Sequence, residues 1–268
     1  MRLGVLGNIS KIKSMDVMEE ILTFLRENGH ETVRFSSYKE VDGVDAVIVL
    51  GGDGAILHAS VPAAQKGIKI IGINYGTLGF LTEYEKDERE KVKELLSALE
   101  SGLCRIVKRS LLEITVRGKT FYALNELAIQ RDNGLTSLST TQILSLEVNV
   151  KEGTDVISGD GLLICTPTGS TAYSLSAGGA ILTPEVPVFM MTPICAFSMR
   201  ARPIVFSDET EFTVKVSKGK AILLSDGRVV AALPENEEIR IKKAPFTADF
   251  PVKEGSDFFA RVKNKLNG

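Results

Sequence analysis

The chain has 268 residues, enough for one large domain or two smaller ones, and its 44% hydrophobic and 25% charged residues are typical of globular proteins. Its 32 basic and 34 acidic residues give a formal net charge of −2, which argues against the overall positive field that attracts nucleic acid or anionic membranes. A polyanionic substrate would therefore need local neutralisation, for which a metal ion is the natural candidate.

The N-terminal part of the chain predicts short apolar strands that alternate with helices. We expect strands over Leu3–Leu6, Thr32–Phe35, Ala46–Leu50 and Ile68–Ile73, and helices over Met15–Asn28, Ala55–Gln65 and Glu85–Leu99. In the first helix, Met18, Ile21, Leu22 and Leu25 recur at helical spacing. Alternation of this kind predicts a Rossmann-like α/β domain with a parallel sheet over residues 1–100.

Strands outnumber helices after a predicted boundary near Ser101 to Arg109. The expected strands are Leu111–Val116, Phe121–Gln130, Ile143–Val150, Leu162–Cys165, Phe212–Val216 and Glu238–Ile241. A last helix is expected over Asp257–Leu266, and it can dock on either domain. We therefore predict a β-rich domain over residues 101–245 and a C-terminal segment, 246–268, able to pack back on the N-terminal domain.

The three cysteines, Cys104, Cys165 and Cys195, are odd in number and far apart, which argues against a disulfide framework or a zinc knot. The N-terminus lacks the pattern of a signal peptide, and the apolar run Ala46–Leu50 is far shorter than the roughly 20 residues that a membrane span requires. We therefore expect a cytoplasmic protein without a membrane partner.

A glycine turn, Gly51-Gly52-Asp53-Gly54, lies between the strand Ala46–Leu50 and the helix that begins near Ala55. Ligands bind at this end of parallel strands, where glycines let the backbone approach a phosphate and the first helical amides point at it. A carboxylate there would repel phosphate, so we interpret Asp53 as catalytic, through a metal or an attacking hydroxyl. The alternative, a tight turn with Asp53 as the helix cap, stays open on this motif alone.

Two further motifs follow or interrupt predicted strands. Residues Gly72–Leu81 can line the same crevice as the glycine turn, or can form a loop whose Leu78, Phe80 and Leu81 pack between the domains. The pair Asn125-Glu126 interrupts an apolar strand, where an amide and a carboxylate need hydrogen-bond partners. A ribose or adenine edge would supply those partners, and an exposed turn or strand face is the alternative.

Hydroxyl groups and glycines crowd into residues 158–179, around the strand Leu162–Cys165 that should end at Pro167. The residues beyond it offer donors on a backbone that can approach a ligand closely: Thr168, Gly169, Ser170, Thr171, Ser174 and Ser176. We interpret the segment as binding a polar ligand rich in phosphate or ribose.

The two histidines, His30 and His58, are too few for a histidine-based metal site or a Ser-His hydrolase. His58 follows Asp53 by five residues, so it can face the same crevice. A surface or packing histidine is the alternative.

The motifs together resemble the NAD kinase family in their order and approximate spacing. They are Gly51–Gly54, Gly72–Leu81, Leu124-Asn125-Glu126, Asp160-Gly161 and Thr166–Gly179. The last is the most specific, because diacylglycerol, sphingosine and 6-phosphofructo kinases share the glycine turn. The resemblance implies that ATP or polyphosphate, with a divalent cation such as Mg²⁺, phosphorylates the 2′-hydroxyl of the adenosine ribose of NAD, giving NADP. It also implies the NAD kinase/diacylglycerol kinase-like fold and a homodimer or homotetramer.

The resemblance also implies roles for individual residues. It makes Asp53 the proton acceptor, Gly51, Gly52 and Gly54 the phosphate-donor loop, and Asp53 and Gly54 part of the NAD site, with His58 near the dinucleotide. Asn125 and Glu126 would hold the adenosine half of NAD, and Asp160 the nicotinamide half across a subunit interface. The residues that would wrap adenine and ribose are Thr171, Ala172, Tyr173, Ser174, Leu175 and Ser176. No metal ligand is assigned, and a metal-binding role for Asp53 is the competing interpretation.

Three positions depart from the family pattern. Ala196-Phe197 follows Thr192–Cys195 where the family commonly has Pro-His, Ser158 stands where some members carry Arg, and Arg228 stands where Gln or Asn is expected. The family's contacts at these positions are therefore not carried over to this chain.

Two other functions stay open on the sequence. A diacylglycerol-type lipid kinase shares the glycine turn but leaves Thr166–Gly179 unexplained. A non-catalytic NAD(P)-binding sensor would not need the intact Asp53 and Asn125-Glu126.

Overall fold

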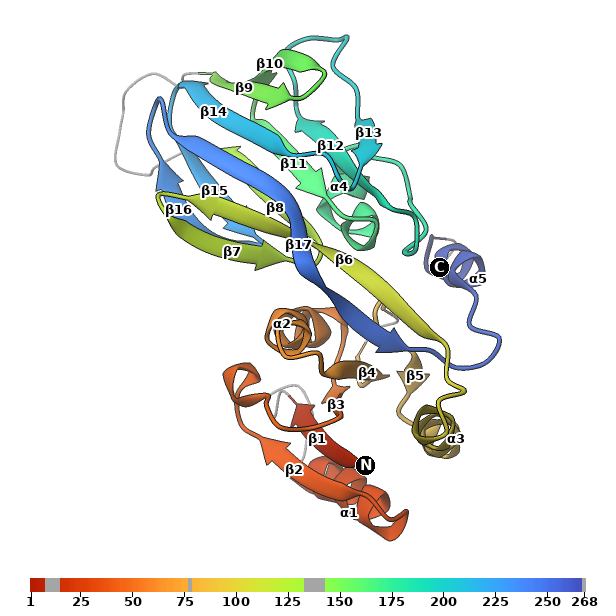
Figure 1. Ribbon diagram of the computed structural model, residues 1–268. Helices are drawn as coiled ribbons and strands as arrows, with labels where there is room; N and C mark the ends of the chain where they lie inside the picture. Colours follow the sequence, from red (N-terminus) through yellow and green to blue (C-terminus); the bar gives the residue numbers. More distant parts are fainter. Residues whose placement is uncertain (8–14, 77–78, 133–142, 267–268) are drawn as a thin grey trace. The chain divides into compact units, whose positions relative to one another are not determined.

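A computed structural model describes residues 1–7, 15–76, 79–132 and 143–266 of the chain (Figure 1). The chain forms two compact units. Unit 1 comprises Met1–Arg109 and Phe246–Gly268, and unit 2 comprises Ser110–Pro245. The chain passes between the units within two long strands, β6 (Ile106–Val116) and β17 (Glu238–Pro251).

Unit 1 is built on a five-stranded parallel sheet in the order β2-β1-β3-β4-β5, which confirms the predicted α/β class. Its strands are β1 (Arg2–Gly7), β2 (Glu31–Phe35), β3 (Ala46–Leu50), β4 (Lys69–Asn74) and β5 (Tyr84–Glu85). Its helices are α1 (Met15–Glu27), the short 3-10 helix η1 (Tyr38–Glu40), α2 (Asp53–Ala64), α3 (Arg89–Glu100) and α5 (Phe258–Leu266).

The parallel sheet is covered on both faces, which is why β3 is apolar and fully buried throughout. Alternate residues of the strands, such as Ile48 and Ile71, pack with α1 and α3 in one hydrophobic cluster. Helix α2 packs over β3 and β4. A Cβ at Gly72 would overlap Ile56 of α2, so glycine lets this helix approach the sheet closely. The glycine turn therefore follows a buried strand at the centre of the sheet.

Two helices in unit 1 begin two or more residues away from the predicted start. Helix α2 begins at Asp53, not near Ala55, because Gly52 serves as its N-cap and brings the aspartate into the first turn. Helix α3 begins at Arg89, not at Glu85, because Tyr84–Glu85 pairs with the end of β4 as strand β5.

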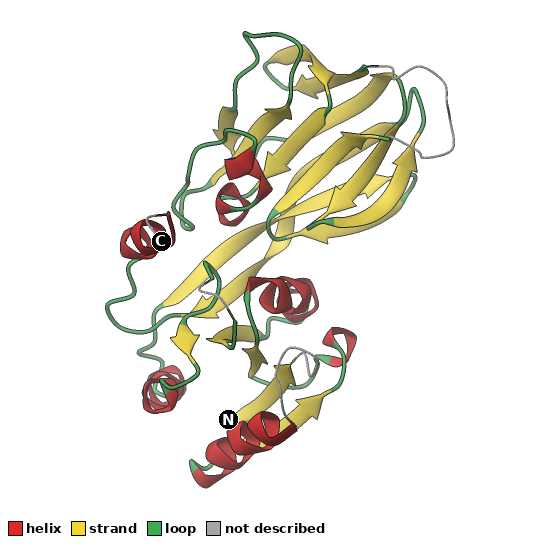
Figure 2. Cartoon of the chain, turned by 180° about the vertical axis from the view of Figure 1, so that it is seen from behind, coloured by secondary structure: helices red, strands yellow, loops and turns green. Residues whose placement is uncertain are grey.

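Unit 2 is rich in β-strands, as predicted, and consists of antiparallel sheets with almost no helix (Figure 2). One sheet has the order β10-β9-β14-β17-β6-β7 and the other β13-β12-β11-β8-β15-β16. The remaining strands of unit 2 are β7 (Lys119–Ala123), β8 (Glu126–Arg131), β9 (Leu144–Val150), β10 (Gly153–Gly159), β11 (Gly161–Cys165), β12 (Val188–Ile194), β13 (Ile204–Ser207), β14 (Phe212–Lys218), β15 (Ala221–Ser225) and β16 (Arg228–Leu233). Its short helices are η2 (Thr168–Thr171) and α4 (Tyr173–Ser176).

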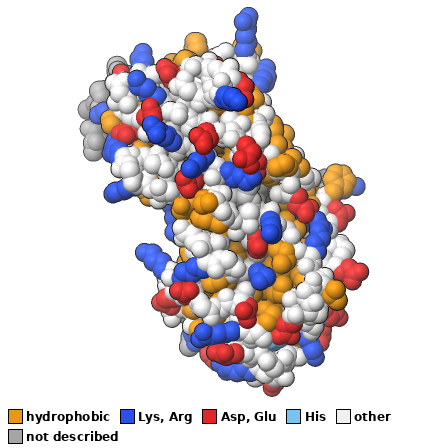
Figure 3. All heavy atoms as spheres, viewed as in Figure 1, with side chains coloured by type: hydrophobic (Ala, Val, Ile, Leu, Met, Phe, Trp, Pro, Cys, Tyr) orange, Lys and Arg blue, Asp and Glu red, His pale blue; other side chains and the backbone are white. Residues whose placement is uncertain are grey.

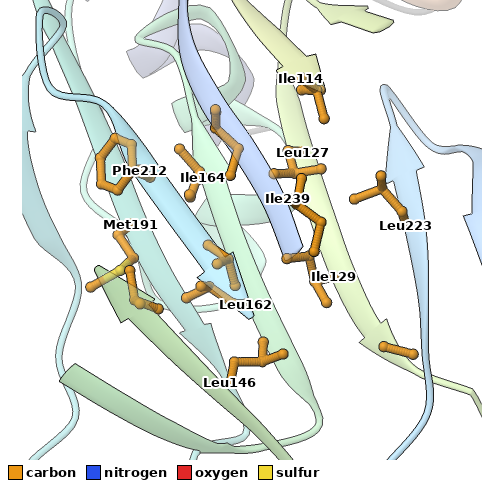
Figure 4. Packing of buried hydrophobic residues seen from close by; sticks show 14 of the residues in the cluster. Ile114, Leu127, Ile129, Leu146, Leu162, Ile164, Met191, Phe212, Leu223 and Ile239 are labelled. Atoms are coloured by element: carbon orange, nitrogen blue, oxygen red, sulfur yellow. The ribbon is translucent and has the colours of Figure 1, made fainter. Parts of the chain in front are cut away.

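Side chains from both sheets form the core of unit 2, among them Leu146, Leu162, Phe212 and Ile239 (Figure 4). In β9 and β14, buried apolar residues alternate with partly exposed ones, as expected for strands with one solvated face. Strand β11 is buried at every residue, and it leads directly into the hydroxyl-rich segment.

The predicted strand Phe121–Gln130 is two strands. Strand β7 belongs to one sheet and β8 to the other, so the chain changes sheets at Leu124 and Asn125. This change of sheet is the physical reason that polar residues interrupt an apolar stretch.

Candidate functional site

The glycine turn forms an uncapped helix N-terminus at the end of β3. Gly51 has a φ of +155°, and a Cβ there would lie 2.8 Å from the Cβ of Ala55, so glycine is required. Gly52 is the N-cap of α2, and because glycine has no side chain, the N-cap residue makes no capping hydrogen bond to the helix. The alternative interpretation of Asp53 as the cap is therefore wrong. The N-cap residue therefore does not compete with an anionic ligand for the first amides of the helix, which fits the phosphate interpretation.

The carboxylate of Asp53 is held by the backbone of the second glycine-containing motif. Phe80 N donates to Oδ2 at 2.7 Å, and Leu81 N donates to Oδ1 at 2.9 Å. A Cβ at Gly79 would overlap Oδ1 of Asp53, so this position needs glycine for the close approach. The side chain of Asp53 keeps 33% of its surface exposed. The structure thus brings the two motifs together around a fixed, accessible carboxylate, although Thr77 and Leu78 of the second motif lie outside the described residues.

Helix α5 contacts the same motif. Arg261 Nη1 donates to the carbonyl oxygen of Phe80 at 3.0 Å, and its Nη2 pairs with Glu83 at 2.7 Å. Lys265 Nζ lies 3.7 Å from Asp53 Oδ2. Sequence reasoning missed Lys265, because a lysine in the last turn of an amphipathic helix carries no motif that separates it from solvent-facing lysines.

His58 of α2 is half-buried and meets the ring of Tyr38 edge to face, with centroids 5.4 Å apart. This contact is the packing role that the sequence left as the alternative for His58.

In unit 2, the carboxylate of Asp226 organises the Asn125-Glu126 turn. Its oxygens accept hydrogen bonds from three consecutive amides, Leu124 N at 2.9 Å, Asn125 N at 2.8 Å and Glu126 N at 3.2 Å. Asp226 itself has a φ of +47°, in the turn that joins β15 to β16. Sequence reasoning missed this role, although the Asp226-Gly227 dipeptide is a typical hairpin signal.

Glu126 is a buried acid with an open hydrogen-bonding position. Its side chain is 7% exposed, and its Oε2 atom has no hydrogen-bond partner among the described residues. Burial raises the pKa of Glu126 to about 8, and the charge of Asp226 adds to the shift. Burial also raises the pKa of Asp226 to about 6, although the hydrogen bonds from the three amides act to lower it. Glu126 is therefore largely protonated at neutral pH, and Oε2 offers a ligand hydroxyl or amino group a partner.

The raised pKa of Glu126 makes stability depend on pH. The pKa of Glu126 is about 8 in the folded chain and about 4.3 in the unfolded chain. The protonated carboxyl group therefore contributes its full stabilisation below about pH 4.3, and this contribution is lost as the pH rises through 8. Between pH 5 and pH 9 we expect a loss of about 2–4 kcal/mol, from roughly 1.36 kcal/mol per pKa unit. Thermal denaturation at both pH values should show a flatter profile for Glu126→Gln than for the wild type. Parallel profiles would contradict the protonated state, and Glu235→Gln, at an exposed carboxylate, is the control.

The hydroxyl-rich segment packs on the Asn125-Glu126 turn. Thr166 donates from Oγ1 to Leu124 O at 2.5 Å and from N to Asn125 O at 2.9 Å. A Cβ at Gly169 would overlap the carbonyl group of Asn125. The turn and the start of the segment therefore form one rigid cluster within unit 2.

The segment's hydroxyls divide into buried and accessible groups. Ser174 is fully buried, and its Oγ lies 2.9 Å from Thr192 Oγ1, so in this structure it packs the segment. Tyr173 is 36% exposed, and its hydroxyl accepts a hydrogen bond from Gln130 at 3.0 Å. Thr171, Ala172 and Leu175 are partly exposed and Ser176 is exposed. The accessible side of the segment therefore lies within Thr171–Ser176, not in the buried hydroxyls before it.

The remaining predicted positions lie on strands and turns of unit 2. Asp160, between β10 and β11, pairs with Arg131 at 3.0 Å. Ser158 Oγ lies 2.9 Å from Ser145 Oγ, so this serine of β10 pairs with the neighbouring strand β9. Arg228 is exposed at the start of β16, and its charge acts to lower the pKa of Asp226. Phe197, in the place of the family's histidine, is 78% exposed.

Both parts of the chain match models of one protein family. The model described as the ATP-NAD kinase N-terminal domain matches residues 10–104, and the model described as the ATP-NAD kinase C-terminal domain matches residues 124–251. These two ranges include the glycine turn, the Asn125-Glu126 turn and the hydroxyl-rich segment.

Curated relatives and solved structures agree with these models. The chain is 34% identical to the NAD kinase of Methanothermobacter thermautotrophicus over 99% of this chain and 96% of that protein. It is 38% identical to the NAD kinase of Carboxydothermus hydrogenoformans over 85% and 81%. An NAD kinase from Archaeoglobus fulgidus, solved with ATP, has a TM-score of 0.79 at 27% identity and covers 100% of this chain and 98% of its own. Yeast NADH kinase, solved with NADH, shares the fold with a TM-score of 0.85 at 23% identity, covering 100% and 87%. The chain belongs to the NAD kinase family.

Proposed function

We propose that Asp53 accepts the proton of the 2′-hydroxyl of the adenosine ribose of NAD while the terminal phosphoryl group of ATP is transferred to that oxygen. The activity itself, phosphorylation of NAD to NADP, follows from membership of the NAD kinase family, and a lipid kinase or a non-catalytic sensor is not favoured. The observation that carries the proposal is the carboxylate of Asp53, fixed by two backbone amides in an uncapped glycine turn.

The geometry of Asp53 suits the orientation of an attacking hydroxyl. Phosphoryl transfer proceeds through a loose transition state, so alignment and charge stabilisation matter most. A carboxylate has about four lone-pair positions, and the amides of Phe80 and Leu81 occupy two of them. The others are left for the 2′-hydroxyl. Because a carboxylate is a weak base toward an alcohol, it chiefly orients the hydroxyl, and the proton moves late in the reaction.

The phosphate donor is proposed to bind at Gly51, Gly52 and Gly54. The helix start at the glycine turn, whose N-cap residue Gly52 has no side chain to bond the first amides of α2, supports this assignment. The Archaeoglobus fulgidus relative was solved with ATP, which supports ATP as the donor. Polyphosphate as a second donor stays a prediction from the family resemblance.

A divalent cation, with Mg²⁺ expected, is proposed to bind together with the donor phosphates. Mg²⁺ is usually held by one or two carboxylates and by substrate phosphates, not by a complete protein cage. The glycine turn fits this pattern, since Asp53 offers one partly exposed carboxylate. Within the described part of the chain, no three His, Cys, Asp or Glu side chains gather to hold a metal by themselves. When bound, the cation would neutralise phosphate charge. Contact with Asp53 is the alternative to the proton-accepting role of that residue, and no other metal ligand is assigned.

The adenosine half of NAD is proposed to bind at Asn125, Glu126 and the accessible side of Thr171–Ser176. The unpartnered Oε2 of Glu126 and the rigid packing of Thr166 on the turn support this assignment. Asp160 is proposed to bind the nicotinamide half, in exchange for its pairing with Arg131. His58 stays a proposed neighbour of the dinucleotide.

Two other properties remain predictions. A homodimer or homotetramer is implied by the family resemblance alone, and a cytoplasmic location rests on cysteine usage and sequence pattern. None of the helices in the described residues is long and apolar enough to cross a membrane. The face shown in Figure 3 mixes acidic and basic side chains, in line with the net charge of −2.

The proposal is tested by NADP formation from NAD with the purified protein. We expect turnover with ATP and Mg²⁺, and loss of turnover when the cation is removed with a chelator. Polyphosphate, NADH and diacylglycerol are offered in parallel, to define the donor and acceptor. Phosphorylation of diacylglycerol with no formation of NADP would point to a lipid kinase. Calorimetric binding of NAD with no formation of NADP would point to a sensor.

A further inference from the structure

Helix α5 places a lysine beside the proposed catalytic carboxylate. Lys265 Nζ lies 3.7 Å from Asp53 Oδ2 and 4.2 Å from the centroid of the Phe80 ring. The N–H of Phe80 donates to the same Oδ2 atom at 2.7 Å. The ammonium group, the ring and the carboxylate therefore form one cluster within unit 1.

Contacts that do not involve Lys265 fix α5 at this place. Arg261, one turn earlier in the helix, bonds to Phe80 O at 3.0 Å and to Glu83 at 2.7 Å. The Arg261 and Glu83 side chains are both largely buried, which strengthens such a pair relative to an exposed one. Phe258 packs its ring against that of Phe80, with centroids 6.4 Å apart. The position of Lys265 is thus set by the packing of its helix.

The site has a need for positive charge that Lys265 meets. The phosphoryl group in transfer carries negative charge, and Asp53 adds another negative charge at the same place. Among the described residues, Lys265 is the cation that lies within 4.0 Å of the Asp53 carboxylate. At 3.7 Å the ammonium makes no tight hydrogen bond to Oδ2, and its side chain is 33% exposed, so its donors remain available to a ligand.

We propose that Lys265 is a further catalytic residue, which contacts the phosphoryl group as it passes from ATP to the 2′-hydroxyl of NAD. This inference rests on the proposed function. In the step, the 2′-oxygen forms a bond to the γ-phosphorus, the bond from that phosphorus to the β–γ bridging oxygen of ATP breaks, and the hydroxyl proton passes to Asp53. Lys265 transfers no proton and stabilises the charge on the phosphoryl oxygens.

The test compares Lys265→Met with Lys263→Met. Lys263 lies on the same helix, with its ammonium 5.6 Å from the centroid of the Phe259 ring. Lys263→Met therefore removes the same positive charge from the helix as Lys265→Met does. We expect Lys265→Met to lower kcat by about 10- to 10²-fold. This loss is smaller than the roughly 10²- to 10³-fold loss on removal of a hydrogen-bond donor from an enclosed oxyanion hole, because Lys265 is partly exposed. The Kd for NAD and the Tm should stay near the wild-type values. Lys263→Met should leave kcat unchanged, and Lys265→Arg should restore much of it.

The readouts separate catalysis from structure and from the proposed function. A kcat for Lys265→Met within twofold of wild type, or an equal loss in Lys263→Met, would overturn the proposal. A lowered Tm together with weaker NAD binding and a normal kcat would assign Lys265 a structural role and also overturn it. If Lys265→Met does not fold, Lys265→Gln is judged by the same criteria. The wild-type protein is assayed first, because failure to form NADP there would contradict the proposed function, not the role of Lys265.

Discussion

Replacement of Asp53 by asparagine is expected to lower the turnover of NAD by about 10²- to 10⁴-fold, the usual scale for a positioned acid or base. The asparagine keeps the size of the side chain but loses the charge that attracts the hydroxyl proton. Its amide oxygen can accept one of the two N–H groups of Phe80 and Leu81, while its amide nitrogen faces the other. We therefore expect a cost of about 1–3 kcal/mol in stability, a retained fold and little change in NAD affinity.

Three measurements decide this prediction: kcat from NADP formation, Kd for NAD by calorimetry, and Tm. Asp45→Asn is the matched control, because Asp45 also lies in unit 1 and accepts a backbone N–H, from Arg2 at 2.7 Å. Near-normal turnover of Asp53→Asn would rule out a catalytic role for this carboxylate. If Asp53 instead serves as a metal ligand, raising the Mg²⁺ concentration should recover part of the lost turnover.

The parallel sheet of unit 1 could be predicted because burial on both faces leaves a strong local signal. Strand β3 is apolar at each position, and the apolar residues of α1 recur at helical spacing. Unit 2 was harder, and strands β10, β12, β13, β15 and β16 were not predicted. Strand β10 is mostly exposed and polar, and β12 contains a proline, so neither shows the alternation that predicts a strand.

The glycine turn with the proposed catalytic carboxylate could be predicted from the sequence, because strand, glycines and carboxylate are adjacent there. The side chains that contact these predicted residues could not be predicted, because they come from distant parts of the chain. Asp226 reaches the amide of Asn125 across 101 residues, and Lys265 reaches Asp53 from the last helix. No local pattern records such contacts, since an aspartate in a hairpin turn and a lysine on a helix are each typical of solvated surfaces.

Replacement of Gly169 by alanine is expected to have the largest effect on stability and NAD binding in unit 2. A Cβ there would overlap the backbone carbonyl group of Asn125. This carbonyl group cannot move away, because two hydrogen bonds hold Asn125. Its carbonyl oxygen accepts the N–H of Thr166 at 2.9 Å, and its own N–H donates to Asp226 at 2.8 Å. We expect a loss of about 3 kcal/mol, at the upper end for overpacking, and a Tm lower by roughly 6–12 °C.

NAD affinity should fall by about tenfold or more in Gly169→Ala, because a displacement of the Asn125-Glu126 turn moves the proposed adenosine contacts. Gly178→Ala is the control. It adds the same methyl group in open space at a φ of +90°, so it carries only a backbone cost of about 1–2 kcal/mol. A Tm loss in Gly169→Ala no larger than that in Gly178→Ala would contradict the cost assigned to the overlap with Asn125. Unchanged NAD binding in a destabilised Gly169→Ala would separate the turn from the dinucleotide site, and would leave Thr171–Ser176 and Asp160 as the remaining proposed contacts in unit 2.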